Sequence, residues 1–216
     1  ASAGMIGWHA GTHGRTEWTA LVGSAVELLR SDHAVEKVVL ARDQVARCDE
    51  RLDARALVTN LQQHYPTTWT YLVDGMVGAT PELLVRHEGG LVTSRVLAGT
   101  IQRTSGEEQA LARALRSSSK DLTEHDFAVT SVARAMAPFC SGMNVPDSPS
   151  VLELPNVLHL ATDITGVAMA GTTSLALASA LHPSAAVCGT PTHVARDLIA
   201  SLEEMDRGRY AGPVGW

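Results

Sequence analysis

The stretch "ELLVRHEGGLVTSRVLAGT", residues 82–100, decides the fold class that this sequence predicts. It holds two apolar, strand-like runs with Gly89 and Gly90 between them, and paired glycines supply the positive φ angles of a hairpin turn. Two further strand-like runs, "WTYLVD" (69–74) and "MVGAT" (76–80), come shortly before it. Strands that follow one another so closely predict an antiparallel arrangement.

Helical patterns lie on both sides of this stretch. Apolar residues at three- and four-residue steps predict a helix over 17–30. Thr190 and Pro191 predict the N-cap and first residue of a last helix that runs to about Met205. Helices interleaved with paired strands favour an α+β fold over a doubly wound parallel sheet. The other expected helices cover 53–64, 106–118, 119–139 and the region near 173–181.

Two more segments have the pattern of strands. The run "KVVLAR" (37–42) is short, apolar and bounded by polar residues, which predicts a central strand. The segment "NVLHLATDITGVAM" (156–169) is a second hairpin candidate.

Composition limits the classes of function. The 216 residues, with 45% hydrophobic residues and mean hydropathy near zero, predict one soluble globular domain over 1–216. The net charge of -6 gives no basic surface for nucleic acid, and no run of about 18 apolar residues could span a membrane. The chain start has no secretory signal pattern. Cys48, Cys140 and Cys188 are odd in number and far apart, which favours a reducing cytoplasm over a disulfide framework or zinc site.

The segment "SSSKDLTEHDFAV" (117–129) opens a helix with two carboxylates, Asp121 and Glu124. The same helix face continues through the small side chains Ala128, Ser131 and Ala135. One interpretation is a pair of solvated acids that the helix dipole favours. The other is a ligand pair for a hard cation such as Mg²⁺, with the small residues leaving room for an anionic substrate.

Lys37 and Glu82 each allow two interpretations. Lys37 opens the run 37–42, and it is either a strand-end lysine that extends to water or a desolvated base with a lowered pKa. Glu82 follows Thr80 and Pro81, so it is either the acidic residue of one capped helical turn or a buried general acid. Neither residue decides between these interpretations alone.

Four other residues carry weaker signals. Gly99 and Thr100 end a strand, where the glycine permits close backbone approach and the threonine could bind an anion, although a simple turn explains them equally well. His159 lies among apolar residues and has the pattern of a core histidine. Tyr210 has the pattern of a half-buried packing residue.

Seven segments, taken in order, resemble the chorismate-utilising enzymes, and among these the sequence is most similar to isochorismate synthase. The resemblance runs from about Lys37 to Trp216. It implies a four-layer α/β/β/α fold built on two large, mostly antiparallel sheets with outer helices. The segments are "KVVLAR", "GATPELLV", "LAGT", "SSKDLTEHDFAV", "LPNVLHLAT", "LHPSAAVCGTP" and "EEMDRGRYAGPVGW".

The resemblance also implies roles for individual residues. Lys37 resembles the base that activates water to attack C2 of chorismate, and Glu82 resembles the acid that protonates the departing C4 hydroxyl. Glu124 resembles a Mg²⁺ ligand, with Asp121 at the neighbouring acidic position. The positions that match substrate contacts are Gly99, Thr100, His159 and Tyr210.

Single residues separate the relatives within this resemblance. Anthranilate synthases have glutamine where Lys37 stands, and aminodeoxychorismate synthases with a covalent mechanism have lysine at the position of Ala98. Lysine together with alanine implies water as the nucleophile. The expected activity is therefore a Mg²⁺-dependent isochorismate synthase, an isomerase of menaquinone, siderophore or salicylate synthesis. A salicylate synthase and a truncated non-catalytic fragment remain the alternatives.

The family pattern extends beyond both ends of this sequence. Past "GPVGW" the resemblance implies further strands, a substrate-clamping arginine and more acidic Mg²⁺ ligands. We therefore expect a chorismate-binding domain that is incomplete at the C-terminus and lacks most of the N-terminal region. The expected partner is chorismate alone, bound by a monomer or a weak homo-oligomer.

Overall fold

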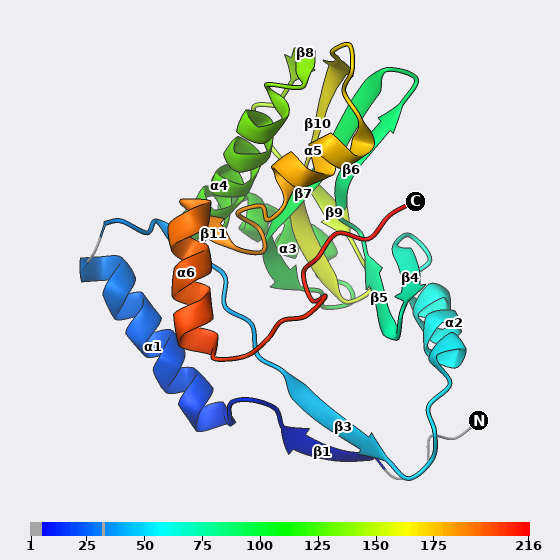
Figure 1. Cartoon of the computed structure of the whole chain (residues 1–216), viewed down its shortest axis with the longest axis vertical. Coiled ribbons are helices and arrows are strands. Elements are labelled where there is room, and N and C mark those ends of the chain that lie inside the picture. Colours follow the sequence, from blue (N-terminus) through cyan, green and yellow to red (C-terminus); the bar gives the residue numbers. More distant parts are fainter. Residues whose placement is uncertain (1–5, 32) are drawn as a thin grey trace.

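The structure, a computed structural model, describes residues 6–31 and 33–216. At its centre lies a five-stranded antiparallel sheet with strand order β6-β7-β10-β8, in which β9 also pairs with β10 (Figure 1). β8 and β9 pair with different parts of β10, so the long strands β7 and β10 form the middle of the sheet. These strands are β6 (Leu83–Glu88), β7 (Leu91–Gln102), β8 (Cys140–Asn144), β9 (Ser150–Glu153) and β10 (Val157–Ala168).

The predicted hairpin at Gly89 and Gly90 is confirmed. Both glycines have positive φ, +57° and +80°, and they join β6 to β7. The hairpin predicted within 156–169 is wrong, because β10 runs unbroken from Val157 to Ala168. Every second residue from Leu158 to Gly166 is buried, so the alternation continues through the whole segment and leaves no place for a turn. The hairpin partner of β10 is β9, which precedes it.

Three helices cover one face of the sheet (Figure 1): α3 (Glu108–Ser117), α4 (Ser119–Met136) and α5 (Ser174–Leu181). Ser118 ends α3 and caps α4, so the predicted pair of consecutive helices is confirmed. The main core forms between this helical layer and the even-numbered residues of the central strands. Its buried members include Val92, Val96 and Ala98 of β7, Ala128, Val132 and Met136 of α4, Ile164 of β10, and Leu177 and Leu181 of α5.

The remaining elements surround this layer pair. α1 (Arg15–Ser31) lies beside α6 (Thr192–Glu203), and α2 (Ala54–His64) packs on the β4–β5 ladder. Three two-stranded antiparallel sheets complete the described residues, and the α+β class with antiparallel sheets and outer helices is confirmed. These sheets pair β1 (Ile6–Ala10) with β3 (Gln44–Cys48), β4 (Trp69–Val73) with β5 (Met76–Thr80), and β2 (Lys37–Val38) with β11 (Gly189–Thr190).

The prediction of a central strand over 37–42 is wrong. Only Lys37 and Val38 form a strand, opposite Thr190 and Gly189 of β11. Past Val38 the pairing continues, within the described residues, only as the bond from the Val39 N–H to the Cys188 carbonyl. Beyond β2, the backbone groups of Val39 and Ala41 are bonded partly by side chains. The last helix also begins one residue later than predicted, with Pro191 as N-cap and Thr190 in β11.

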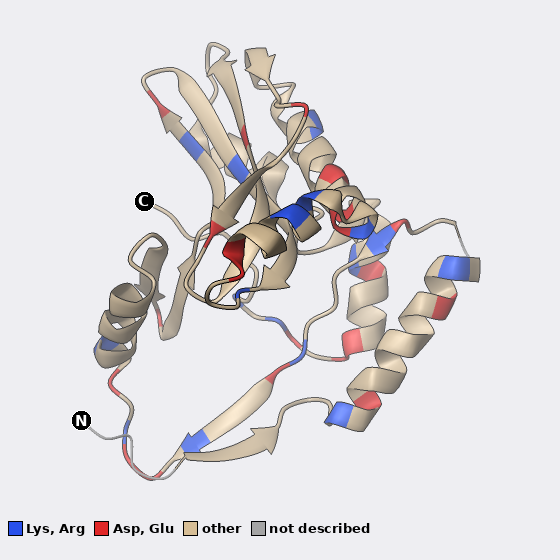
Figure 2. Cartoon of the chain, turned by 180° about the vertical axis from the view of Figure 1, so that it is seen from behind, with Lys and Arg blue, Asp and Glu red and all other residues tan. Residues whose placement is uncertain are grey.

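The distribution of charged residues agrees with the low net charge of the sequence. Basic and acidic residues are interspersed along the chain in Figure 2, with no extended basic face in that view. Within the described residues, no helix is both long and apolar enough to cross a membrane. Cys48, Cys140 and Cys188 are free thiols, as the sequence predicts.

Candidate active site

Lys37 lies in a partly dehydrated setting. It pairs with Thr190 across the β2–β11 ladder, and its side chain is half-buried. Burial lowers the pKa of Lys37, while the nearby carboxylates of Glu124 and Glu82 act in the opposite direction. An amine that is held away from water beside two carboxylates differs from a lysine that extends into solvent. The burial of Lys37 therefore favours its interpretation as a base.

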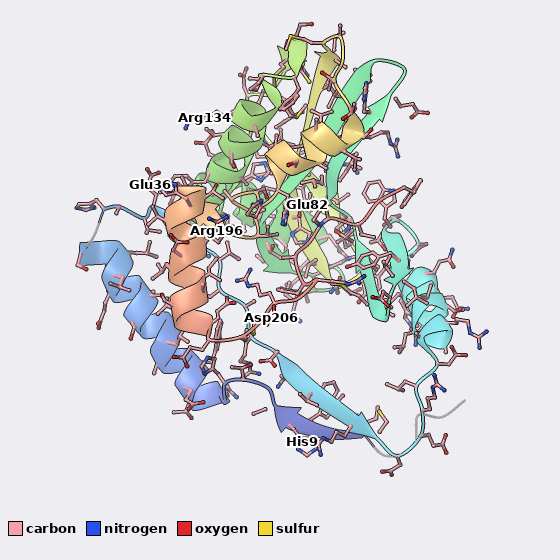
Figure 3. All side chains as sticks on the ribbon, viewed as in Figure 1. His9, Glu36, Glu82, Arg134, Arg196 and Asp206 are labelled. Atoms are coloured by element: carbon pink, nitrogen blue, oxygen red, sulfur yellow. The ribbon has the colours of Figure 1, made fainter. Side chains whose placement is uncertain are left out.

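Glu82 lies in the connection between β5 and β6, near the middle of the molecule (Figure 3). Its N–H donates to Thr80 Oγ1 at 3.2 Å, but no helical turn follows, so a helix dipole does not explain its position. Burial raises the pKa of Glu82 to about 7, although the backbone N–H of Leu97 and the charge of Lys37 act against this shift. The carboxyl group can therefore hold a proton near neutral pH.

Asp121 and Glu124 have different environments on α4. The Ser118 hydroxyl accepts the Asp121 N–H at 3.3 Å and donates to Asp121 Oδ2, which makes Asp121 part of a helix cap. Glu124 lies one turn further along and acts electrostatically on Lys37 and on His125. Asp121 is thus partly occupied by the cap, and Glu124 is the α4 carboxylate whose charge acts on the lysine.

Gly99 forms a β-bulge at the end of β7 that faces α4. Its φ is +77°, and the register between β7 and β10 shifts there, between His159 and Leu160. A Cβ at Gly99 would lie 3.1 Å from the Asp121 backbone oxygen and 3.1 Å from Leu160 Cδ1. Only glycine combines this backbone conformation with such a close approach.

The bulge brings Thr100 opposite His159. The Thr100 hydroxyl and His159 Nδ1 are 2.8 Å apart, which is a hydrogen bond. Burial lowers the pKa of His159, against an opposing backbone hydrogen bond with Gly99. The imidazole is therefore neutral at physiological pH, and together with Thr100 it presents polar groups without adding charge.

Tyr210 is not gathered with the other predicted residues. Its side chain is 58% exposed, and the Arg207 guanidinium carbon lies 6.0 Å from the centre of its ring. The described part of the chain contains no hydrogen bond from Tyr210 to Lys37, Glu82 or Glu124. The half-buried packing position expected from the sequence is also not found.

The sequence interpretation missed His125, which is 3% exposed on α4 next to Glu124. Its Nδ1 lies 3.1 Å from the carbonyl of Ala98, and its Nε2 lies 2.8 Å from the Thr162 hydroxyl. Since the carbonyl can only accept, Nδ1 donates and Nε2 accepts. Burial is the main cause that lowers the pKa of His125. This neutral histidine connects α4 to both central strands, and its only sequence signal is a polar residue in line with buried Ala128 and Val132.

The candidate carboxylate ligands for a divalent cation are Asp121 and Glu124. Within the part of the chain that the structure describes, no group of three or more His, Cys, Asp or Glu side chains could hold a metal ion. Mg²⁺ takes one or two carboxylates and completes its octahedron with water and substrate oxygens. Glu124 fits such a ligand, and Asp121 offers the oxygen that Ser118 leaves free.

Replacing Gly189 with alanine should destabilise the protein strongly. A Cβ there would lie 2.1 Å from the backbone oxygen of Lys37 and 2.6 Å from Ala195 Cβ, so β2 and β11 would have to separate. We expect a loss of about 1–3 kcal/mol or more in the free energy of unfolding, measured by thermal denaturation. Gly23→Ala in α1 is the matched control, because its Cβ would meet no atom within 4 Å. Equal melting temperatures for the two variants would contradict this prediction.

Known proteins resemble this chain over most of its length. A family model described as "Chorismate binding enzyme" matches residues 8–216. Isochorismate synthase DhbC of Bacillus subtilis is 39% identical over 200 residues, which are 86% of this chain and 50% of that protein. Isochorismate synthase EntC of Escherichia coli is 34% identical over 209 residues, which are 94% of this chain and 53% of that protein.

A solved structure agrees with these matches. MenF, the menaquinone-specific isochorismate synthase from Escherichia coli, superposes with a TM-score of 0.81 at 25% identity, covering 95% of this chain and 48% of that one. Anthranilate synthase component I from Streptococcus pneumoniae, at 24% identity, has the same fold with a TM-score of 0.79. The chain spans about half the length of the relatives that it matches.

Proposed function

Since this chain belongs to the family of chorismate binding enzymes, we propose that it provides the catalytic acid and base of an isochorismate synthase. The reaction converts chorismate to isochorismate by adding water at C2 and removing the C4 hydroxyl. One observation carries this proposal: Lys37 and Glu82 interact electrostatically, and burial moves their pKa values in opposite directions, each toward the neutral form. Relatives named isochorismate synthases, with identities of 39% and 34%, support the same activity.

Lys37 acts as the general base in this proposal. Water is a weak nucleophile until a positioned base takes its proton. The neutral amine accepts that proton while the water oxygen bonds to C2 of the ring. Burial of Lys37 serves this step because it favours the uncharged amine.

Glu82 acts as the general acid. Hydroxide is a poor leaving group, so the C4–O bond breaks readily only when an acid protonates the oxygen. As the new C2–O bond forms, the two ring double bonds each move by one position and the C4 hydroxyl leaves as water. A carboxyl group with a pKa of about 7 is still protonated in part at neutral pH and can supply this proton.

One turnover converts a neutral pair into an ion pair. Lys37 ends with the proton of the attacking water, and Glu82 ends as a carboxylate. Each charge then favours the other, because the charge of either group opposes the effect of burial on its partner's pKa. A proton must pass from Lys37 to Glu82, directly or through solvent, before the next cycle.

The other residues bind and orient the substrate in this proposal. Thr100 and neutral His159 offer hydrogen bonds next to the bulge at Gly99. Glu124 would hold Mg²⁺, with Asp121 beside it, and the bound metal would orient the ring carboxylate of chorismate and stabilise its charge. The small Ala98 on β7 leaves no amine that could attack the ring, which favours water as the nucleophile.

The direct test is product analysis. A full-length protein that contains this chain, incubated with chorismate and Mg²⁺, should form isochorismate, detected through coupled isochorismatase, and EDTA should abolish the product. Salicylate with an equal amount of pyruvate would instead identify a salicylate synthase. If no product forms with Mg²⁺ present, the proposed activity is wrong. Isochorismate would supply menaquinone or siderophore synthesis, and the named relative MenF is specific for menaquinone.

A further inference from the structure

Glu203 and Arg207 form an ion pair inside the protein, away from the groups that react. Glu203 ends α6 and is 1% exposed, and Arg207 follows it by four residues. Arg207 Nε donates to Glu203 Oε2 at 2.7 Å, and Nη2 donates to Oε1 at 2.5 Å. This two-pronged contact fixes the guanidinium plane.

The pair also bonds to the backbone of two other segments. Glu203 Oε1 accepts the N–H of Ala41 at 2.6 Å, and Arg207 Nη2 donates to the carbonyl of Val39 at 2.9 Å. Arg207 Nη1 donates to the carbonyl of Val187 at 3.2 Å, next to the segment that leads into β11. The ion pair therefore joins both chains of the β2–β11 ladder just beyond its ends.

We propose that the Glu203–Arg207 pair is a positioning device that holds the backbone from Val39 to Ala41, and so fixes β2 and the point from which the Lys37 side chain extends. The inference rests on the proposed role of Lys37 as the base. The β2–β11 ladder is only two residues long on each side, too short to fix a long side chain by itself. Beyond it, the N–H of Val39 bonds to Cys188, and the two charged side chains bond the carbonyl of Val39 and the N–H of Ala41.

Energetics favour positioning over simple stabilisation. Burying two charges costs desolvation energy that often offsets their attraction, so a buried ion pair is a weak device for stability. Its geometry is specific, because the guanidinium fork of Arg207 makes bonds to a carboxylate and two carbonyls at once. A displacement of about 1 Å at a catalytic group can cost about a hundredfold in rate.

The lysine content of the chain gives a direct measurement. The sequence contains two lysines, Lys37 and Lys120, and the Lys120 side chain is 85% exposed. After reductive methylation with ¹³C-formaldehyde, NMR can follow the titration of both side-chain amines in one sample. Lys120 then serves as the internal reference for a hydrated lysine.

The decisive variant is the double change Glu203→Gln with Arg207→Gln, because Arg207→Gln alone would leave a lone buried carboxylate and destabilise the fold. We expect the titration midpoint of Lys37 to rise toward that of Lys120, which should not move. The rising limb of the pH–rate profile should move to higher pH together with this midpoint. In addition, kcat should fall about tenfold to a hundredfold with little change in KM. Arg209→Gln is the matched control, since Arg209 forms an exposed pair with Asp74.

The outcomes separate the two proposals. An unchanged Lys37 midpoint in the folded double variant would overturn the positioning role, whatever the activity of Lys37→Ala. The positioning role would also be overturned if activity fell at every pH while the rising limb stayed at its original pH. The ion pair would then have only a structural role. Full turnover by Lys37→Ala would overturn the role of the base itself, and the titration would still report whether the ion pair places that amine.

Discussion

Replacing Lys37 with alanine should lower kcat for isochorismate formation by about two to four orders of magnitude, the usual contribution of a positioned general base. Alanine cannot accept the proton of the attacking water, and no other lysine can replace it, because the second lysine of the chain, Lys120, is 85% exposed. The dissociation constant for chorismate should change little, since in the proposed mechanism Lys37 acts on the water and not on the ring. Steady-state kinetics and equilibrium binding would measure the two quantities.

The matched control for this prediction is Lys120→Ala. Lys120 Nζ lies 3.9 Å from Asp121 Oδ1, and because the lysine side chain is exposed, the pair contributes little. This variant should keep normal kcat and KM. Near-normal turnover in Lys37→Ala would show that Lys37 is only a half-buried strand lysine, and the proposed mechanism would then need another base.

Glu82→Gln should cause a loss of similar size, about two to four orders of magnitude in kcat. The amide has nearly the same shape as the acid but cannot deliver a proton to the C4 oxygen. In the unmodified enzyme, kcat/KM should fall as pH rises above about 7, because Glu82 then ionises. The residual activity of the variant should lack this falling limb, which a pH profile of kcat/KM would reveal.

The same variant should be more stable than the unmodified protein at alkaline pH. Folding raises the pKa of Glu82 from its ordinary value of 4.5 to about 7, so the folded protein keeps a proton that the unfolded chain loses. Stability must therefore fall as pH rises between these two values. Glu82→Gln has no such titration, and its melting temperature relative to the unmodified protein should increase from about pH 5 to about pH 8.

Glu88→Gln is the control for loss of one negative charge, since Glu88 lies exposed beside the hairpin turn of β6 and β7. It should show normal turnover, since it removes the same charge without touching a buried group. If Glu82→Gln turned over chorismate normally, or if its stability difference stayed flat with pH, Glu82 would not be the buried acid.

The sequence predicts the parts of the fold that depend on local patterns. Gly89 and Gly90 mark a turn because the two residues alone meet its conformational demand. The segment 37–42 has the composition of a strand, but past Val38 the side chains of Glu203 and Arg207 bond the carbonyl of Val39 and the N–H of Ala41. These partners lie far from 37–42 in the sequence, so a local pattern cannot predict their contacts.

In the candidate site too, some features follow from local sequence and others depend on the fold. Lys37, Glu82 and Glu124 can be identified from the order of motifs, whereas their mutual interaction and the opposite shifts in pKa depend on the folded chain. His125 was missed because the sequence does not show that it is buried. Its burial depends on its hydrogen-bond partners Ala98 and Thr162, which lie on other elements. The position of Tyr210 is set by the course of the C-terminal segment, in which the structure has no helix or strand after Glu203.

The extra residue at the bulge in β7 determines to which face of the sheet each later residue of the strand points. In a regular strand Ala98 and Thr100 would share a face, but the bulge at Gly99 leaves Ala98 toward the core and puts Thr100 opposite His159 on the other face. A residue that forced position 99 into the regular pleat would turn Thr100 inward and carry Ile101 out of its apolar contacts. A substitution at Thr100, in contrast, alters one side chain only. A library of variants around Thr100 should therefore keep Gly99 and vary the side chains beside it.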